Sequence, residues 1–232
     1  MKISCKLAIG ALSALLPVSL ALGQQDYIGQ FDVYTGYMYL NSPLISLGES
    51  GFHTQVGMSP AKWYTLGLDF STGYGDTALV TSMLNSKTQA QIDSALSPIG
   101  VNPASIQLPL RSRSQTYSMG PQLNYRHFKK VTLFIHPDLG AIHEIATPMP
   151  DTLLTTLLVH EMLPSGRPKT DWVGFYGFGG GITVLPARHV GVKLHVDFVH
   201  DHLFPDILNG RNSVRLSVGP IFYMGKNLAE AK

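Results

Sequence analysis

A strict two-residue alternation of apolar and polar residues runs through most of this 232-residue chain and limits its possible folds more than any other feature. Between Tyr64 and Tyr74, every second residue is aromatic, leucine or threonine, and the residues between them are small, polar or charged. Successive side chains of a β-strand point to opposite faces, so this segment is predicted to be a strand with one apolar and one polar face. A strand of about 11 residues is long enough to cross a bilayer at a tilt.

The alternation occurs eight times in all, and the connections between the eight segments predict the topology. Short turns are predicted near residues 59–62, 127–130 and 186–189. Long connections are predicted at residues 41–51, 76–112, 145–170 and 201–211. Strict alternation of short and long connections is typical of an all-β, antiparallel up-and-down transmembrane barrel with short periplasmic turns and long outer loops. The first connection is long, so both ends of the barrel domain are predicted to lie in the periplasm of a bacterium.

A soluble sandwich or lipocalin-like barrel would also alternate, but its apolar face points inward and its charged face outward. Here the polar faces are rich in glycine and serine and poor in lysine and glutamate, unlike a solvated surface. Aromatic residues lie near the ends of the apolar faces, as they do in the girdles of membrane barrels. The pattern therefore favours a barrel with its apolar face toward lipid, and the soluble barrel is the alternative.

The N-terminal residues have the composition of a cleaved signal peptide, in which Lys2 and Lys6 precede an apolar run from Leu7 to Leu22. Loss of the two lysines leaves 15 of the 17 basic residues against 15 acidic ones. This balance argues against nucleic acid as a partner. Cys5, the single cysteine, lies in the signal, so no disulfide or thiol chemistry is expected in the mature protein. The predicted segments are the signal peptide at 1–23, the barrel domain at 24–225 and a short periplasmic tail at 226–232.

The last predicted strand carries the most specific motif of the chain. A polar residue, a glycine and two spaced hydrophobic residues follow one another as Ser217, Gly219, Phe222 and Met224. This motif resembles the assembly signal of small eight-stranded outer-membrane barrels, the OmpA-like transmembrane domain and its single-domain relatives. The resemblance covers Tyr27 to Gly225 and implies insertion by the outer-membrane barrel assembly machinery into a membrane that contains lipopolysaccharide. The chain departs from the pattern because residues 226–232 follow the motif. No peptidoglycan-binding domain follows either, so that activity of larger relatives is not implied.

Ten charged or histidine residues share the inward-facing parity and predict a polar network in the lumen: Asp32, His53, Asp69, Arg126, His136, Asp138, Lys193, His195, Asp197 and Arg215. The lumen of an eight-stranded barrel is just wide enough for side chains to fill it, and unpaired charges there are costly. We therefore predict a network that neutralises itself. A symmetric turn around Ala61 would place His53 directly across from Asp69, and Asp197 lies on a strand next to that of Arg215.

Two alternatives give the lumen a more active role, namely a path for protons or ions and a metal site formed by His53, His136 and His195. The histidines come from separate strands, and no ligand spacing marks them. The prediction is therefore that the protein has no cofactor and no metal ligand.

The glycine-rich segment FYGFGGGITVL, residues 175–185, is predicted to be a strand rather than a phosphate-binding loop. A dinucleotide fingerprint needs a third glycine and a following helix, and both are missing here. On the strand register, Gly179 points inward opposite Asp197. Gly181 points inward opposite His195. These glycines are predicted to make room for large polar side chains in a narrow lumen.

Three prolines fall within predicted strands, at Pro121, Pro137 and Pro220, where each lacks an N–H group for the sheet. The first two lie on strands that a short turn joins, so they are expected to be near each other. We predict a bulge or a local break in the sheet at that place.

Two of the outer connections contain apolar segments. Residues 83–96 have partly helical spacing ahead of Pro98, and residues 151–162 are unusually apolar for a loop. The second segment suits a short helix on the rim of the barrel or a surface that binds a partner. Packing of these loops on their neighbours is the favoured interpretation.

Some small outer-membrane barrels are lipid A deacylases or acyltransferases that use serine, histidine and an acid near the outer rim. The neighbouring histidines and acids of this chain are His143 with Glu144, His160 with Glu161, and His200 with Asp201 and His202. None lies in a serine-containing motif, and adjacent residues of a strand point to opposite faces. We therefore predict no catalytic residues and a structural or surface-interaction role, with an extracellular partner bound through the outer loops. A narrow pore and a lipid A-modifying enzyme are the alternatives.

Overall fold

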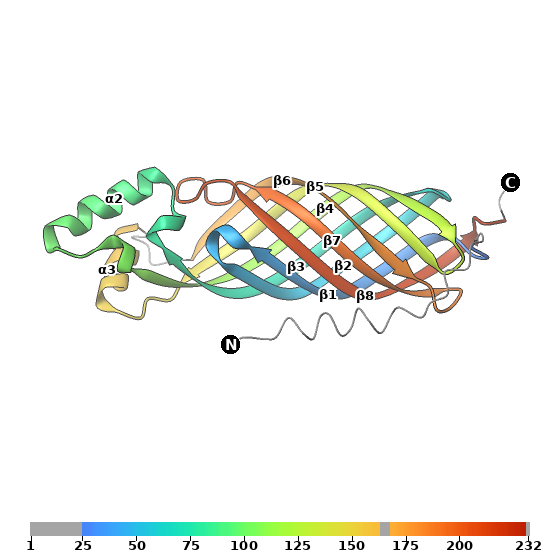
Figure 1. Cartoon of the computed structure of the whole chain (residues 1–232), viewed down its shortest axis with the longest axis horizontal. Coiled ribbons are helices and arrows are strands. Elements are labelled where there is room, and N and C mark those ends of the chain that lie inside the picture. Colours follow the sequence, from blue (N-terminus) through green and yellow to red (C-terminus); the bar gives the residue numbers. More distant parts are fainter. Residues whose placement is uncertain (1–24, 163–167, 231–232) are drawn as a thin grey trace.

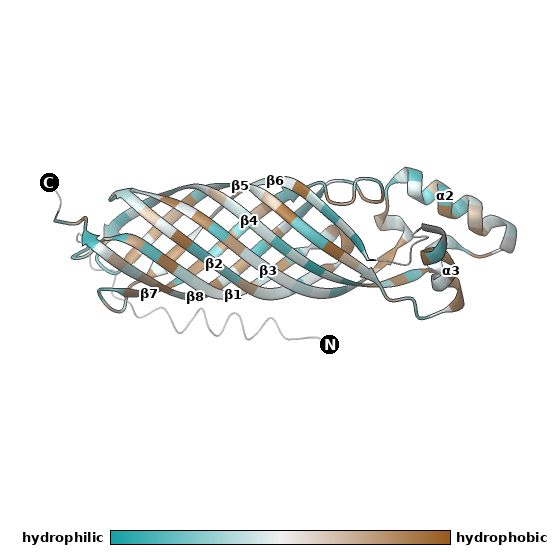
Figure 2. Cartoon of the chain, turned by 180° about the vertical axis from the view of Figure 1, so that it is seen from behind, coloured by the Kyte–Doolittle hydropathy of each residue, from teal (hydrophilic) through white to brown (hydrophobic). Residues whose placement is uncertain are grey.

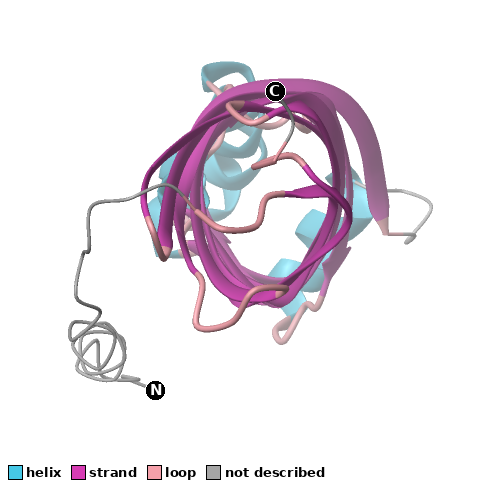
Figure 3. Cartoon of the chain, turned by 90° about the vertical axis from the view of Figure 1, so that its right-hand side faces the viewer, coloured by secondary structure: helices cyan, strands magenta, loops and turns pink. Residues whose placement is uncertain are grey.

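The structure, a computed structural model, describes residues 25–162 and 168–230, in which eight antiparallel strands close into a barrel (Figure 1). The strands are β1 (Gly29–Ser42), β2 (Leu47–Ala61), β3 (Tyr64–Val80), β4 (Gln107–Phe128), β5 (Val131–Pro148), β6 (Lys169–Val184), β7 (Val190–Asp201) and β8 (Arg211–Asn227). Each strand pairs with the next along the chain, and β8 pairs with β1 to complete the ring that Figure 3 shows end-on. The predicted eight-stranded up-and-down barrel is therefore confirmed. The predicted signal peptide lies outside the described residues.

Short helices lie in the connections at one end of the barrel, which we call the loop end because β1, β3, β5 and β7 lead into it (Figure 1). They are η1 (Pro43–Ile45), η2 (Thr81–Met83), α2 (Ser86–Leu96), η3 (Ser97–Ile99), η4 (Pro103–Ser105) and α3 (Leu153–Met162). None of the helices in the described part of the chain is long and apolar enough to span a membrane. The opposite end, where the tight turns and the first and last described residues lie, is called the turn end.

The apolar faces of the strands point outward. Large apolar side chains are exposed on every strand, as at Phe31, Phe52, Leu68, Met119, Ile135, Phe178, Phe198 and Val218. Apolar and polar residues alternate along the wall of the barrel in Figure 2. A soluble barrel would bury these side chains, because large continuous apolar surfaces are rare on soluble monomers. The orientation of the two faces agrees with the lipid-facing arrangement that the sequence favours.

The strands extend farther toward the loop end than the sequence predicted. The connection from β1 to β2 is limited to residues 43–46, because paired residues continue up to Ser42 and Leu47. The prediction of a long loop at 41–51 is therefore wrong. Two further connections shrink to residues 81–106 and 149–168, and the one at 202–210 is one residue shorter at each end than predicted.

One predicted register is confirmed and another is wrong. On β6 and β7, Gly179 pairs with Asp197 and Gly181 pairs with His195, as predicted. On β2 and β3, His53 lies across from Ser71 rather than from Asp69. The turn that joins these strands is not symmetric, since the register shifts between Met58 and Ala61.

The prolines interrupt the pairing of the strands but do not shift its register. Between β4 and β5, paired residues stop at Met119–Leu139 and resume in the same register at Leu123–Ile135, on either side of Pro121 and Pro137. The predicted local break is thus present, and it is not a bulge. Pairing of β8 with β1 is likewise interrupted beside Pro220. A proline has no N–H to donate, so the ladder loses a hydrogen bond at each of these places.

Replacing Gly179 or Gly181 by leucine is expected to impair assembly of the barrel. A Cβ atom at Gly179 would overlap Oδ1 of Asp197 and Nε2 of His136. A Cβ atom at Gly181 would overlap the backbone carbonyl oxygen of Leu194. The measurement is heat-modifiable migration on a gel after refolding in detergent, in which a folded barrel migrates differently from the boiled protein.

Gly174→Leu on the same strand is the matched control. The atom nearest to a Cβ at this exposed position, the carbonyl oxygen of Gly140, lies 3.8 Å away, so the leucine fits. Normal migration of all three variants would show that the inward-facing glycines are not needed for space.

Candidate functional site

The interior of the barrel is the strongest candidate site, because large polar side chains fill it. The side chains of Lys193, Arg211 and Arg215 are at most 2% exposed. Each of these cations must find partners inside the lumen, since burial of an unpaired charge is costly.

Arg215 lies at the centre of the lumen and bonds to strands on several sides. Its Nε donates to Oδ2 of Asp197 on β7 at 2.7 Å, and its Nη2 donates to Oδ2 of Asp138 on β5 at 3.1 Å. Its Nη1 donates to Oγ1 of Thr116 (3.1 Å) and to Oγ of Ser71 (3.2 Å). The predicted pairing of Asp197 with Arg215 is confirmed. Asp138, which lies across the lumen, is a second carboxylate partner.

His136, His195 and Asp197 meet beside this guanidinium group. The Nε2 atoms of His136 and His195 are 2.6 Å apart. Oδ1 of Asp197 lies 2.9 Å from Nε2 of His195 and 3.2 Å from Nε2 of His136. The three residues come from β5 and β7, and the glycines of β6 between these strands leave the space in which the three side chains meet.

His53 joins a serine and an aspartate. Its Nε2 lies 2.8 Å from Oδ1 of Asp69, and its Nδ1 lies 2.9 Å from Oγ of Ser217. These are the residue types of a hydrolase triad, but the order of the ring nitrogens is the reverse of the serine protease arrangement. Ser217 is 2% exposed and His53 is fully buried, and neither lines the pockets at the two ends of the barrel. This chain of contacts therefore lies inside the packed lumen, where it connects β2, β3 and β8.

Lys193 lies nearer to the turn end. Its Nζ donates to Oε1 of Gln55 and, at 3.0 Å, to Oε1 of Gln122. The ammonium group also lies 4.2 Å from the centre of the Phe134 ring. Gln55 in turn donates to Oδ2 of Asp69 at 3.3 Å, and Asp69 connects Lys193 through Gln55 to His53.

A second ionic cluster lies toward the loop end, and its residues were not among those predicted for the lumen network. Arg211 donates from Nε to Asp201 (2.9 Å) and from Nη2 to Oε2 of Glu144 (2.6 Å). Ser112 donates to Oε1 of Glu144 at 3.0 Å, and Glu49 accepts from Ser114. All of these residues keep the inward parity of their strands. The alternation beyond the predicted strand ends was the signal that would have found them.

Two of the ten residues predicted for the lumen network lie apart from these clusters. Asp32 is buried beside Gly57, and no ion pair or hydrogen bond of its side chain is found among the described residues. Arg126 lies at the turn end, where Nε donates to the carbonyl oxygen of Lys62 at 2.9 Å and Nη1 to Oε1 of Gln25 at 3.4 Å. Gln25 itself is 2% exposed and covers this end of the lumen.

The residues of the predicted assembly signal divide between the two faces of β8. Ser217 points into the lumen, whereas Phe222 and Met224 are exposed on the outside. Gly219 lies against the backbone of β1 at Thr35 and Gly36, where a side chain would not fit. Recognition of this motif by the assembly machinery stays a prediction.

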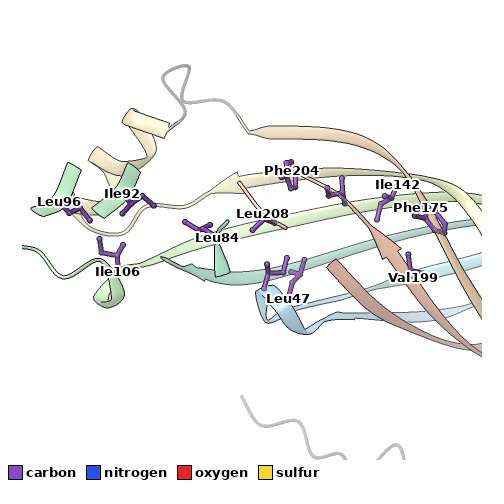
Figure 4. Packing of buried hydrophobic residues seen from close by; sticks show 12 residues of the cluster. Leu47, Leu84, Ile92, Leu96, Ile106, Ile142, Phe175, Val199, Phe204 and Leu208 are labelled. Carbon is purple, nitrogen blue, oxygen red and sulfur yellow. The ribbon is translucent and has the colours of Figure 1, made fainter. Parts of the chain in front are cut away.

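An apolar cluster closes the loop end (Figure 4). Figure 4 shows side chains of α2 at one end of the cluster and side chains of the barrel wall at the other. The buried members are Ile45, Leu47, Leu84, Ile92, Leu96, Ile106, Ile142, Phe175, Val199, Leu203, Phe204 and Leu208. A mainly apolar cavity of ≈ 100 Å³ lies among them, with Glu144 and Ser112 in its lining.

Two hydrogen bonds tie the start of α2 to the connection between β7 and β8. The backbone N–H of Asn85 donates to the carbonyl oxygen of Ile207 at 2.7 Å, and the side-chain hydroxyl of Thr88 donates to that of Asp206 at 3.1 Å. On α3, Leu154 and Leu158 pack against the apolar cluster, so the predicted packing of residues 151–162 on their neighbours is confirmed.

Among the histidine–acid pairs considered for an enzyme, those on the strands have side chains that point to opposite faces of the strand. His143 stacks on Trp172, with ring centres 4.5 Å apart, while Glu144 points inward to Arg211. His200 binds Oδ1 of Asn212 at 2.7 Å, whereas its neighbour Asp201 also points inward to Arg211. His160 is exposed on α3, and the side chain of Glu161 lies outside the described residues.

No protein-family model matches the chain, and no curated protein matches it. Solved structures do resemble it. Outer membrane protein OprG from Pseudomonas aeruginosa has 8% identity and a TM-score of 0.50, over 87% of this chain and 99% of that one. Neisserial surface protein A has 12% identity and a TM-score of 0.49, over 84% and 97%. Ail, the attachment invasion locus protein of Yersinia pestis, has 14% identity and a TM-score of 0.44, over 84% and 99%. At such low identity the likeness concerns the fold alone, and the chain has the fold of small eight-stranded outer-membrane barrels.

Replacing Arg215 by methionine is expected to lower the free energy of unfolding by about 3–5 kcal/mol, because two buried carboxylates lose their partner. Arg111→Met is the matched control, since Arg111 and Asp76 form an ion pair with side chains 60% and 70% exposed. Loss of such a pair changes stability by at most about 1 kcal/mol. Urea unfolding of the refolded protein, followed by tryptophan fluorescence, measures both. Equal effects of the two substitutions would contradict the central position of Arg215.

Proposed function

We propose that this protein is a closed, non-conducting barrel of the bacterial outer membrane with a structural or surface-interaction role. The observation that carries the proposal is the lumen, which buried polar side chains fill from Arg211 near the loop end to Lys193 near the turn end. A barrel of eight strands is at the size where side chains fill the interior and leave no channel.

The outer surface supports a location in the membrane. Apolar side chains are exposed on all eight strands, and burying this area in lipid removes it from water at roughly 25 cal/mol per Å². Apart from the interruptions beside the prolines, the polar backbone groups are paired within the closed sheet, as a bilayer demands. Outer-membrane lipid, including lipopolysaccharide, is the partner that this surface fits, and the barrel assembly machinery is the partner that would insert it.

Both ends of the barrel argue against a pore. Gln25 covers the turn end through hydrogen bonds of Nε2 to Thr132 Oγ1 (2.8 Å) and to the carbonyl oxygen of Val131 (3.2 Å). The apolar cluster that includes Leu47 and Leu84 covers the loop end. An ion would have to displace both covers and break the ionic contacts between them.

The loop end supports a role in surface interaction. α2 and α3 project beyond the barrel wall there (Figure 1), and with periplasmic turns this end faces the outside of the cell. On α3, Leu153 is 78% exposed and Leu157 is 59% exposed, one helical turn apart. We propose that an extracellular partner binds through these connections.

Reconstitution into a planar bilayer tests the closed lumen. We expect no stable channel events from the refolded protein under conditions in which an open porin conducts. Heat-modifiable migration of the same sample controls for folding. Reproducible single-channel steps from the folded protein would establish the narrow pore instead.

Mass spectrometry of lipid A tests the enzymatic alternative. We expect the acyl pattern to be unchanged when the protein is expressed in a Gram-negative host, because the Ser217–His53–Asp69 chain is closed to substrate. A host that carries His53→Gln at the same expression level is the control. An acyl chain removed or added only by the unmodified protein would show that the lumen opens to lipid.

A further inference from the structure

We propose that His136, His195 and Asp197 form a binding site for a divalent transition-metal ion inside the barrel. This inference goes beyond the proposed function, since a closed structural barrel needs no metal. It begins with the convergence of three ligand atoms. Nε2 of His136, Nε2 of His195 and Oδ1 of Asp197 all lie within 3.2 Å of one another.

The geometry suits a three-ligand site. An ion at ~2.0–2.1 Å from all three atoms, the usual zinc–nitrogen and zinc–oxygen distance, would lie roughly 1 Å outside the plane that the atoms define. The ligand atoms of a tetrahedral site are ~3.3 Å apart, so the two rings would move apart by less than ~1 Å on binding. Two imidazoles and one carboxylate are ligands that suit zinc and its first-row neighbours, whereas magnesium and calcium prefer oxygen alone.

The hydrogen bonding of Asp197 points to a ligand independently of these distances. Its Oδ2 is bound by Arg215, but its Oδ1 is fully buried and accepts no hydrogen bond among the described residues. Nε2 of His195 and Nε2 of His136 lie 2.9 Å and 3.2 Å from Oδ1, yet neither contact has the geometry of a hydrogen bond. A buried carboxylate oxygen without a donor is costly unless a cation binds it. A metal ion between the three atoms would satisfy it.

The charges of the lumen favour a cation at this place. In the described part of the chain, buried carboxyl groups outnumber buried lysine and arginine side chains by six to three. The carboxyl groups are those of Asp32, Glu49, Asp138, Glu144, Asp197 and Asp201. Solvent ions do not enter a lumen filled by side chains, so a bound dication would offset much of this excess.

The glycine strand makes the site possible. His136 and Asp197 lie on β5 and β7, on either side of Gly179 of β6, and a side chain at Gly179 would overlap the ligand atoms of both. The ion would therefore join two strands that are not neighbours. His53 lies outside the ligand set, although its ring centre is 5.1 Å from that of His195, because Asp69 and Ser217 engage both of its nitrogens.

A proton is the competing occupant. One proton shared between the two Nε2 atoms would also explain their 2.6 Å separation. It would leave Oδ1 of Asp197 without a donor, which is why the ion is the better explanation. The two occupants differ in metal content and in spectroscopy.

The test uses the full-length mature protein, stripped of metal, refolded in detergent with Zn²⁺ or Co²⁺ and then desalted. Refolding is the loading step because the ligands are at most 7% exposed. We expect about one ion per chain by elemental mass spectrometry, and visible absorption of Co²⁺ typical of tetrahedral coordination. Absence of bound metal, or a weak octahedral Co²⁺ spectrum, would overturn the proposal without any substitution.

Variants assign the ion to its ligands. His136→Gln and His195→Gln are each expected to lower the metal affinity by ~10-fold or more, since even outer-shell changes have effects of this size. His53→Gln is the buried control and is expected to retain the ion. Binding that survives both ligand substitutions would overturn the proposal.

The half-buried His200 and the exposed His202, with ring centres 4.8 Å apart, are a second place where histidines could capture metal. A double substitution of both to glutamine controls for it and is expected to leave the ion in place. Loss of the ion in that variant would show binding at the surface only. Heat-modifiable migration verifies the folding of each variant. If a ligand variant does not fold, the Co²⁺ spectrum of the wild-type protein alone tests the proposal.

Discussion

A guanidinium group and two carboxylates meet at the centre of the barrel, where Arg215 of β8 bonds to Asp197 of β7 and to Asp138 of β5. A buried charge has no water to solvate it, so these contacts must form together with the closure of the sheet. They also fix the register. A slip of one residue in β8 would turn Arg215 toward the outside and an apolar residue toward the lumen. The ionic contacts of the lumen and the hydrogen bonds of the wall thus specify the same arrangement.

The space for these contacts comes from the residues that have no side chain. In β6, Gly179 and Gly181 stand opposite Asp197 and His195, and a Cβ atom at either position would overlap its surroundings. One strand with small residues therefore allows its two neighbours to place large side chains over it. This is why the glycine-rich stretch belongs to the wall of the barrel and not to a flexible loop.

The sequence could predict the strands and their faces, which depend on local alternation. It could not predict contacts between side chains that are far apart in the chain. Period-two patterning identified eight strands and their faces, and it placed Asp197 and Arg215 on the inward faces of neighbouring strands. The His53 register was wrong because it depended on the shape of the turn near Ala61. Arg211 was assigned to a loop and Glu144 was considered only beside His143, although the parity of both residues points inward. The meeting of His136 with His195 crosses an intervening strand, and no spacing in the sequence reports such a contact.

Closure and charge balance are connected in this barrel. Gln25 covers one end of the lumen and an apolar cluster covers the other, and in the closed barrel that we propose they keep dissolved counter-ions away from the charges between them. An open channel could leave an excess of carboxylates for mobile cations to neutralise. A closed one has to neutralise them with groups that are fixed in place, either by protons on histidines and carboxyl groups or by a bound metal ion. Because side chains fill the lumen, the stability of the barrel depends on whether its few histidines are protonated or bind a metal ion.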